Sequence, residues 1–396
     1  MTNVREVTND IFWIGADDRR LALFENTYPL PNGVSYDSYI IMDEKTVLMD
    51  CVDASVADIF FENLRNVLNG RLLDFVVVQH MEPDHSATLA RLIEMYPDVT
   101  IICNAKTETM IHQFFKDTLV AKIQLVKEGE ESTTGRHTLK FIMTPMVHWP
   151  EVMMTYDENA KILFSADAFG CFGAMNGALF ADEVNFNDDY LSEARRYYAN
   201  IVGKYGAPVQ AVLKKSAALD IQMICPLHGF VWRKGLDFLL DKYEKWSTYQ
   251  PEENAVVVAY ASMYGNTAKV AEKAATLLVK KGYPVRVYDL SKTSVDVVLG
   301  EIFRASHMIL ASATHDGGLF APMAHLIQEM IAHNMQNRKV TLIENGSWAP
   351  MAGKEMKTLL DSMKNMTIVE PVLSIKSTLL EAQEKDLEKL VDALVA

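Results

Sequence analysis

Residues 72–86 read LLDFVVVQHMEPDHS, a short apolar run followed at once by a cluster of ionisable side chains. A continuous apolar run such as Leu72–Val78 is typical of a buried β-strand. Where such a strand ends, the chain turns, so neighbouring side chains can converge on one cavity. Four of the side chains that follow this strand are potential metal ligands: His80, Glu82, Asp84 and His85. Taken alone, the segment would also fit a polar loop with two incidental histidines.

Three distant residues favour the metal site. His148 ends the run FIMTPMVH, Asp167 ends the run ILFSAD, and His228 follows the run IQMICPL. Each is a ligand-type residue placed just after a β-run, as in the first segment. Together the four segments supply seven potential ligands, which exceeds the three or four that one metal ion usually takes from a protein. The pattern therefore predicts a pair of metal ions bridged by a carboxylate.

Short strands, loops and a few helices are expected from Asn9 to about Met223. Besides Leu72–Val78, the expected strands are the hairpin Ser38–Cys51 and the runs Val99–Asn104, Thr138–Thr144, Met153–Tyr156, Ile162–Ser165 and Ile221–Cys225. The expected helices are Ala57–Leu68, Ser86–Tyr96, Glu193–Val202 and Pro208–Ala218. The polar stretch Lys245–Asn254 then interrupts the apolar pattern and marks a boundary, which divides the chain into domains 1–249 and 254–396.

Apolar strands alternate with amphipathic helices after this boundary. The expected strands are Val256–Tyr260, Val285–Asp289, Met308–Ser312, Val340–Glu344 and Ile368–Val372. The expected helices are Thr267–Lys281, Ala324–His333, Lys354–Met363 and Leu379–Val395. This alternation predicts a doubly wound, five-stranded parallel sheet.

The first strand of this second domain leads into a loop that suits an anion. Residues 255–270 read AVVVAYASMYGNTAKV, in which hydroxyl groups and backbone N–H groups gather at the start of a helix. Gly265 allows a close approach of the backbone. The segment lacks the GK[ST] of a Walker loop and the GxGxxG of a dinucleotide site. The later loops Ser312–Pro322 and Asn345–Gly353 follow adjacent strands, at the edge where open α/β sheets bind ligands.

The order of the seven ligand-type residues resembles that of the metallo-β-lactamase fold, an αββα sandwich. Glu82, in place of the usual second histidine, resembles the flavodiiron proteins, also called A-type flavoproteins. The resemblance implies one non-haem iron held by His80, Glu82 and His148, a second held by Asp84, His85 and His228, and Asp167 as the bridge. The extra carboxylate favours Fe(III), which argues for redox chemistry over hydrolysis. The chain departs from the family's pattern at Ala87, where glycine is common, and in Leu23–Gly33, which contains no histidine.

The loop at 262–267 resembles the flavodoxin phosphate loop, S/T-x-x-G-N-T, and this resemblance implies FMN as the second cofactor. In flavodoxins the two later loops hold the isoalloxazine ring. The FMN contacts implied in this chain are Ser262, Met263, Tyr264, Gly265, Asn266, Thr267, Ala313, Thr314, His315, Asp316, Gly317, Gly318, Asn345, Gly346, Ser347, Trp348, Ala349 and Gly353. Trp348 is expected to flank the ring, although a core or interface aromatic would fit the sequence equally well.

The resemblance spans nearly the whole chain and implies reduction of O₂ to water, of NO to N₂O, or of both. Electrons would pass through FMN from a separate donor, such as rubredoxin or another reductase. It also implies a head-to-tail homodimer, or a dimer of dimers, that places the FMN of one subunit near the irons of the other. The alternatives are a zinc-dependent hydrolase with an accessory flavin domain, and an electron carrier or redox sensor that is not an enzyme.

Composition restricts the partners. The formal net charge of −14 gives no attraction to nucleic acid or to anionic lipid. The four cysteines form no C-x-x-C pair, so we expect no disulfide framework and no appended rubredoxin domain. The first residues, MTNVREVTNDIFWIG, lack the apolar core of a signal peptide, and no stretch approaches the ~20 apolar residues that span a bilayer. A cytoplasmic location is therefore expected.

Overall fold

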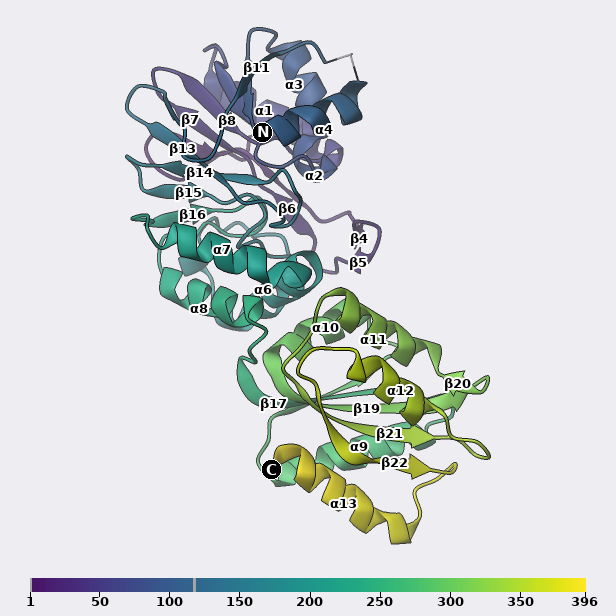
Figure 1. Cartoon of the computed structure of the whole chain (residues 1–396). Helices are drawn as coiled ribbons and strands as arrows, with labels where there is room; N and C mark the ends of the chain where they lie inside the picture. Colours follow the sequence, from purple (N-terminus) through teal and green to yellow (C-terminus); the bar gives the residue numbers. More distant parts are fainter. Residues whose placement is uncertain (1, 117–118) are drawn as a thin grey trace. The chain divides into compact units, whose positions relative to one another are not determined.

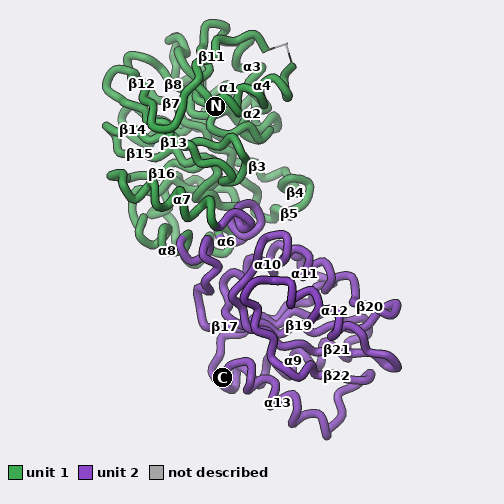
Figure 2. Tube along the Cα trace, in the orientation of Figure 1, with its two compact units in different colours: residues 1–194, 207–243 green, residues 195–206, 244–396 purple. Residues whose placement is uncertain are grey.

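The computed structural model describes residues 2–116 and 119–396. The chain forms two compact units, shown in Figure 2: residues 1–194 with 207–243, and residues 195–206 with 244–396. Each unit contains its own β-sheet core. The division of the sequence into domains 1–249 and 254–396 stays a prediction.

The first unit contains two main sheets. The seven-stranded sheet has the order β1-β2-β7-β8-β9-β10-β11, with strands Arg5–Glu6, Ile11–Trp13, Tyr39–Met42, Thr46–Met49, Phe75–Val77, Thr100–Cys103 and Lys122–Leu125. The five-stranded sheet has the order β12-β13-β14-β15-β16, with strands Glu131–Thr133, Thr138–Met143, Met153–Asp157, Ile162–Phe164 and Met223–Cys225. Two small hairpin-like sheets join β3 (Ala16–Asp18) to β6 (Val34–Tyr36) and β4 (Leu23–Phe24) to β5 (Tyr28–Pro29).

Helices lie on the outer sides of the two main sheets, as Figure 1 shows. The helices of this part of the chain are α1 (Ala57–Leu68), α2 (Pro83–Ser86), α3 (Leu89–Met95), α4 (Ala105–Phe115), α5 (Phe186–Asp189), α6 (Leu191–Tyr197), α7 (Gly206–Ser216) and α8 (Leu236–Ser247). The sheets contact each other directly, since the rings of Tyr39 and Phe164 lie 5.6 Å apart. The expected sandwich of two sheets covered by helices is confirmed.

The strands that the sequence analysis expected in this unit are present, whereas β1–β6, β11 and β12 were not predicted. Helix α1 has the predicted bounds, because its buried residues Phe60, Phe61, Leu64 and Leu68 recur at helical spacing. The helix expected over Ser86–Tyr96 is present but shorter, as α3, and α2 ends where it was expected to begin. Pro83 occupies the first position of α2 and so starts a helix inside the predicted ligand loop. Helices α4 and α8 were not predicted.

The second unit is a doubly wound sheet. Its parallel strands follow the order β18-β17-β19-β21-β22, and their bounds are Val285–Asp289, Glu253–Ala261, Ala305–His315, Lys339–Asn345 and Thr367–Ile375. The short antiparallel strand β20 (Gly318–Leu319) pairs with the end of β19. The helices are α9 (Asn266–Lys280), α10 (Val295–Arg304), α11 (Ala321–Ala332), α12 (Ala352–Asp361) and α13 (Glu381–Val395). The predicted five-stranded parallel sheet is confirmed, whereas α10 was not predicted.

The core of the second unit explains why its strands read as continuous apolar runs. Val256 and Val258 of β17, Ile309 of β19 and Ile343 of β21 are fully buried beneath α9 and α13. A parallel sheet covered on both faces needs apolar side chains in both directions. Because β17, β19 and β21 are parallel neighbours, the loops that follow them emerge together at the carboxyl edge of the sheet.

Candidate metal centre and cofactor pocket

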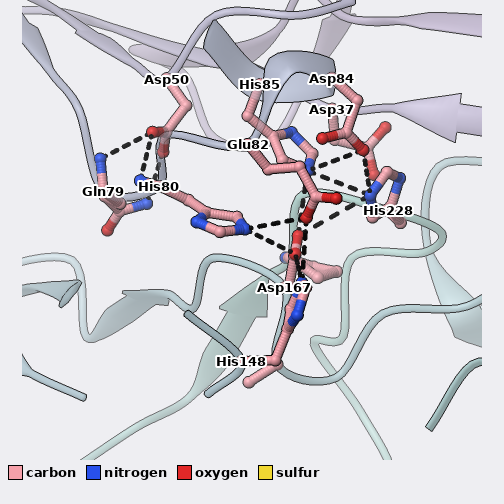
Figure 3. A network of polar contacts seen from close by, with 12 residues as sticks. Asp37, Asp50, Gln79, His80, Glu82, Asp84, His85, His148, Asp167 and His228 are labelled. Carbon is pink, nitrogen blue, oxygen red and sulfur yellow. Dashed lines mark hydrogen bonds and ion pairs between the residues drawn. The ribbon is translucent and has the colours of Figure 1, made fainter. Parts of the chain in front are cut away.

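The seven predicted metal ligands gather at one place in the first unit (Figure 3). His80 and Glu82 lie in the loop after β9, and Asp84 and His85 lie in α2. The remaining three follow strands of the other sheet: His148 after β13, Asp167 after β15 and His228 after β16. Both sheets thus contribute side chains to one buried cluster, which the sequence predicted from the ends of strands.

The ligand-type atoms form two groups. In the first group, Nε2 of His80 lies 3.2 Å from Oε2 of Glu82, and Nε2 of His148 lies 3.1 Å from the same oxygen. In the second group, Oδ2 of Asp84 lies 3.3 Å from Nε2 of His85 and 3.2 Å from Nε2 of His228. Within each group the ligand atoms all lie within 4.8 Å of one another, a spacing that suits one metal ion per group.

Asp167 faces both groups with different oxygen atoms. Its Oδ2 lies 3.2 Å from Nε2 of His80 and 3.1 Å from Nε2 of His148. Its Oδ1 lies 3.0 Å from Nε2 of His85. A carboxylate that presents one oxygen to each of two clusters has the geometry of a bridging ligand.

The donor set fits metal ions better than it fits hydrogen bonds. Nε2 of His85 lies 3.1 Å from Nε2 of His228, 3.3 Å from Oδ2 of Asp84 and 3.0 Å from Oδ1 of Asp167, and the one N–H of a neutral imidazole cannot serve all three. Oδ1 of Asp167 and both carboxylate oxygens of Asp84 are buried, and within the described residues they make no hydrogen bond. Buried oxygens of this kind are costly unless a cation or a donor satisfies them. The residues present therefore suit two cations.

Electrostatics within the cluster agree with this interpretation. Burial alone would raise the pKa of Asp167, but the neighbouring imidazoles of His85 and His80 hold it well below its ordinary value. Burial would lower the pKa of His148 and of His228, but carboxylates beside each of them raise it to about 9. The protein thus places anionic oxygens against imidazole rings that favour a positive charge, and a metal ion competes with protons for the same nitrogens.

Several carboxylates near the cluster were not predicted from the sequence, among them Asp50 and Glu25. Asp50, just after β8, accepts hydrogen bonds from the backbone N–H (2.7 Å) and the side-chain amide (2.8 Å) of Gln79, so it fixes the start of the ligand loop. Glu25 lies at the exposed tip of the β4–β5 hairpin. The surrounding protein and a hydrogen bond with Glu82 raise the pKa of Glu25 to about 8. The one feature of the sequence that could have indicated Glu25 is that it is a carboxylate in Leu23–Gly33, the segment that contains no histidine.

A cavity of about 630 Å³ lies in the second unit at the carboxyl edge of the sheet. This volume is within the range of small-molecule sites. The cavity is lined by fifteen of the predicted contacts: Ser262, Met263, Tyr264, Asn266, Thr267, Ala313, Thr314, His315, Asp316, Gly317, Asn345, Gly346, Ser347, Trp348 and Ala349. Gly265, Gly318 and Gly353 do not line it, and Met351 and Ser377 line it without having been predicted. Ser377 was missed because it follows the fifth strand, to which no loop was assigned.

Hydrogen bonds shape the loops of this cavity. Oγ of Ser262 accepts from the N–H of Gly265, which has φ +90° and precedes the first turn of α9. Oγ1 of Thr314 accepts from the N–H of Met351 at 2.9 Å and so ties the second loop to the third. Tyr264 and Trp348 are 96% and 89% exposed, so Trp348 is not a core residue. A helix N-terminus beside two accessible aromatic rings suits a phosphorylated aromatic cofactor such as FMN.

Comparisons with known proteins agree with both sites. Residues 34–229 match the ODP family of β-lactamase-like domains, and residues 258–390 match flavodoxin. The anaerobic nitric oxide reductase flavorubredoxin of Vibrio vulnificus is 32% identical over 356 residues, which cover 86% of this chain and 70% of that protein. An uncharacterised protein of Methanocaldococcus jannaschii is 30% identical over 94% of this chain and 93% of its own length.

A solved structure supports the same conclusion. Rubredoxin:oxygen oxidoreductase from Desulfovibrio gigas superposes with a TM-score of 0.91 at 27% identity, covering 99% of this chain and 98% of that one. The fold and the two sites thus define a β-lactamase-like metal domain joined to a flavodoxin domain. The chain belongs to the flavodiiron protein family. FMN and a non-haem di-iron centre are accordingly its cofactors, as the sequence analysis expected.

Proposed function

We propose that this chain is an oxidoreductase that reduces O₂ to water, NO to N₂O, or both, at its di-iron centre. The observation that carries the proposal is the buried set of seven ligand-type residues with a carboxylate at position 82. The relatives point the same way, since one is named as a nitric oxide reductase and another as a rubredoxin:oxygen oxidoreductase.

The proposed ligand assignment follows the two groups of atoms. His80, Glu82 and His148 would hold one iron, and Asp84, His85 and His228 would hold the other. Asp167, whose two carboxylate oxygens face one group each, would serve both. The iron pair would supply the redox chemistry that these side chains lack. The side chains themselves set the charge of the site. Phe24 packs edge-on against the ring of His228, with ring centroids 5.4 Å apart.

FMN would occupy the cavity of the second unit. The loop 262–267 would bind the phosphate at the start of α9, and the loops 313–318 and 345–353 would enclose the isoalloxazine ring. Tyr264 and Trp348 are the aromatic residues placed to flank it. Gly265, Gly318 and Gly353 would act through the shape of the backbone, because they do not line the cavity.

The partners follow from the same proposal. Rubredoxin or another reductase would reduce the FMN, and a head-to-tail homodimer, or a dimer of dimers, would bring each FMN near the irons of the partner subunit. Among the described residues, none of the helices has the length and apolar character needed to cross a membrane. We propose a cytoplasmic location.

The test is to purify the protein without oxygen, quantify iron, zinc and flavin, and measure NO and O₂ consumption in parallel with reduced rubredoxin. We expect two irons and one FMN per chain, and steady consumption of at least one gas. Two zincs with hydrolase activity would instead support the hydrolase alternative, and a lack of turnover with both gases would support an electron carrier.

A further inference from the structure

Glu151 is a buried carboxylate beside the metal cluster that is not one of the seven ligands. It lies just before β14 and is 1% exposed. Its Oε1 lies 2.8 Å from Nδ1 of His80 and accepts a hydrogen bond from the N–H of Met81 at 2.9 Å. Its backbone carbonyl accepts from the side chain of Asn104 at 2.6 Å, which fixes the main chain at this point. Glu151 therefore contacts the ligand loop from the side opposite the cluster.

The contact with Nδ1 determines which nitrogen of His80 can bind a metal. A carboxylate accepts but does not donate, so the hydrogen of the neutral imidazole must sit on Nδ1. The lone pair is then on Nε2, the atom that lies 3.2 Å from oxygens of Glu82 and Asp167. A carboxylate hydrogen-bonded to a ligating histidine also fixes its ring and increases its basicity.

The Nδ1 atoms in the second group have different surroundings. Nδ1 of His228 lies 2.7 Å from the backbone carbonyl of Ser35, which is neutral. Nδ1 of His85 is buried and, within the described ranges, makes no hydrogen bond. Asp50 bonds the backbone and side chain of Gln79 rather than an imidazole ring of the second group. Nδ1 of His80 thus faces a carboxylate oxygen, whereas Nδ1 of His228 faces a backbone carbonyl oxygen.

We propose that Glu151 is a positioning residue for His80, and that metal binding at the position of His80, Glu82 and His148 depends on it while the other position does not. The proposal rests on the ligand assignment made under Proposed function. It adds a residue to that assignment and makes the two metal positions unequal.

Two substitutions separate the charge of Glu151 from its hydrogen bonds. Glu151→Ala removes both, so we expect one of the two metal equivalents to bind about 10–100-fold more weakly. Glu151→Gln keeps the volume and an oxygen that can accept from His80 and Met81, so we expect a smaller loss at the same equivalent. The other equivalent should keep its wild-type affinity in both variants.

The matched control is Asp43→Asn. Asp43 is also a buried carboxylate that accepts backbone and side-chain hydrogen bonds, including one from Thr134 at 2.8 Å. It lies in the turn between β7 and β8, and its Oδ2 accepts from Thr134 and from the backbone N–H of Arg136 and His137, none of which is a metal ligand. Asp43→Asn should lower the thermal stability of the protein and leave both metal affinities unchanged.

The measurement is anaerobic titration of the full-length apo-protein with Co²⁺ against a competing chelator, followed by Mössbauer spectra of the ⁵⁷Fe-loaded protein. We expect only one of the two iron signals to change in Glu151→Gln. Wild-type affinity at both positions in Glu151→Ala, or equal weakening at both positions in Glu151→Gln, would overturn the inference. A wild-type chain that binds fewer than two metal ions would instead contradict the ligand assignment.

Discussion

Asp167 is the residue on which the two groups of ligands depend. Its oxygens contact imidazoles of both groups, and it is 1% exposed. Asp167→Ala should therefore weaken both metal equivalents by at least about 100-fold, more than the loss of an outer hydrogen-bonding partner. Gas reduction should fall to background. Metal analysis after gel filtration checks the first expectation, and retention of two tightly bound irons would contradict the bridging assignment.

His137 lies in a second buried cluster of the first unit, with Asp10 and Asp157, neither of which is a metal ligand. Its Nδ1 lies 2.5 Å from Oδ2 of Asp157, and its Nε2 lies 3.2 Å from Oδ2 of Asp10. The hydrogen bond with Asp157 raises the pKa of His137, although burial opposes the shift. Protonated His137 therefore stabilises the folded chain.

Because the folded pKa is the higher one, this stabilisation is complete below the unfolded pKa of about 6.5 and is lost as the pH rises through the raised value. His137→Gln should lower the free energy of unfolding by about 1–3 kcal/mol at pH 6, and by less at higher pH. Urea unfolding at several pH values measures the difference. His112→Gln, an exposed histidine of α4, is the control, and a pH-independent difference for His137→Gln would contradict the interpretation.

At the scale of elements, the start of α9 carries the proposed phosphate site. Gly265 precedes this helix with φ +90°, and Gly282 follows it with φ +85°. A Cβ at either position would meet no atom within 4 Å, so an alanine would cost backbone strain alone, about 1–2 kcal/mol.

Gly265→Ala should reduce FMN affinity by roughly 5–30-fold, because the strained loop must relax away from the shape that binds phosphate. Gly282→Ala imposes the same strain at the far end of α9, so it should leave FMN affinity unchanged. Titration of the apo-protein, followed by quenching of FMN fluorescence, compares the two. Equal losses in both variants would show that helix stability, and not the loop, controls FMN binding.

Helix α10 is an element that the sequence analysis missed. Nine of its ten residues are buried, including Asp296, Glu301 and Arg304. Asp296 pairs with Arg196 at 2.8 Å, and Arg304 pairs with Glu301 at 2.8 Å. The apolar residues of α10 recur at helical spacing as clearly as those of α1, so a helix was predictable here, whereas its burial and its ion pairs depend on the tertiary structure. Arg196, the partner of Asp296 on the segment 195–206, lies 100 residues away from it in the sequence.

At the scale of the whole molecule, the proposed head-to-tail dimer predicts complementation between two inactive variants. Asp167→Ala removes the metal site of one subunit, and a chain unable to bind FMN lacks the other cofactor. In a mixed dimer, one intact FMN would lie near one intact metal centre of the partner subunit. Mixing the variants under conditions that exchange subunits should therefore restore part of the activity.

Gel filtration and gas-consumption assays before and after mixing measure this recovery. A mixture of one variant with itself is the control for the exchange procedure. A stable mixed dimer without activity would contradict the transfer of electrons between subunits, and a monomeric protein that reduces gas would contradict the dimer itself.

The sequence by itself determined the fold class of both units and the identity of the seven ligand-type residues. Both are local signals: an apolar run predicts a strand, and the residue type that follows it is visible in the sequence. The loops of the FMN pocket were predictable for the same reason, since the carboxyl ends of parallel strands share one edge.

Only the tertiary structure decided how these residues divide into two groups and which carboxylates support them. His80 and Glu151 are 71 residues apart, and Glu25 approaches Glu82 from a separate hairpin. Such contacts depend on the packing of two sheets against each other, and no local pattern records which buried side chains that packing brings within hydrogen-bonding distance.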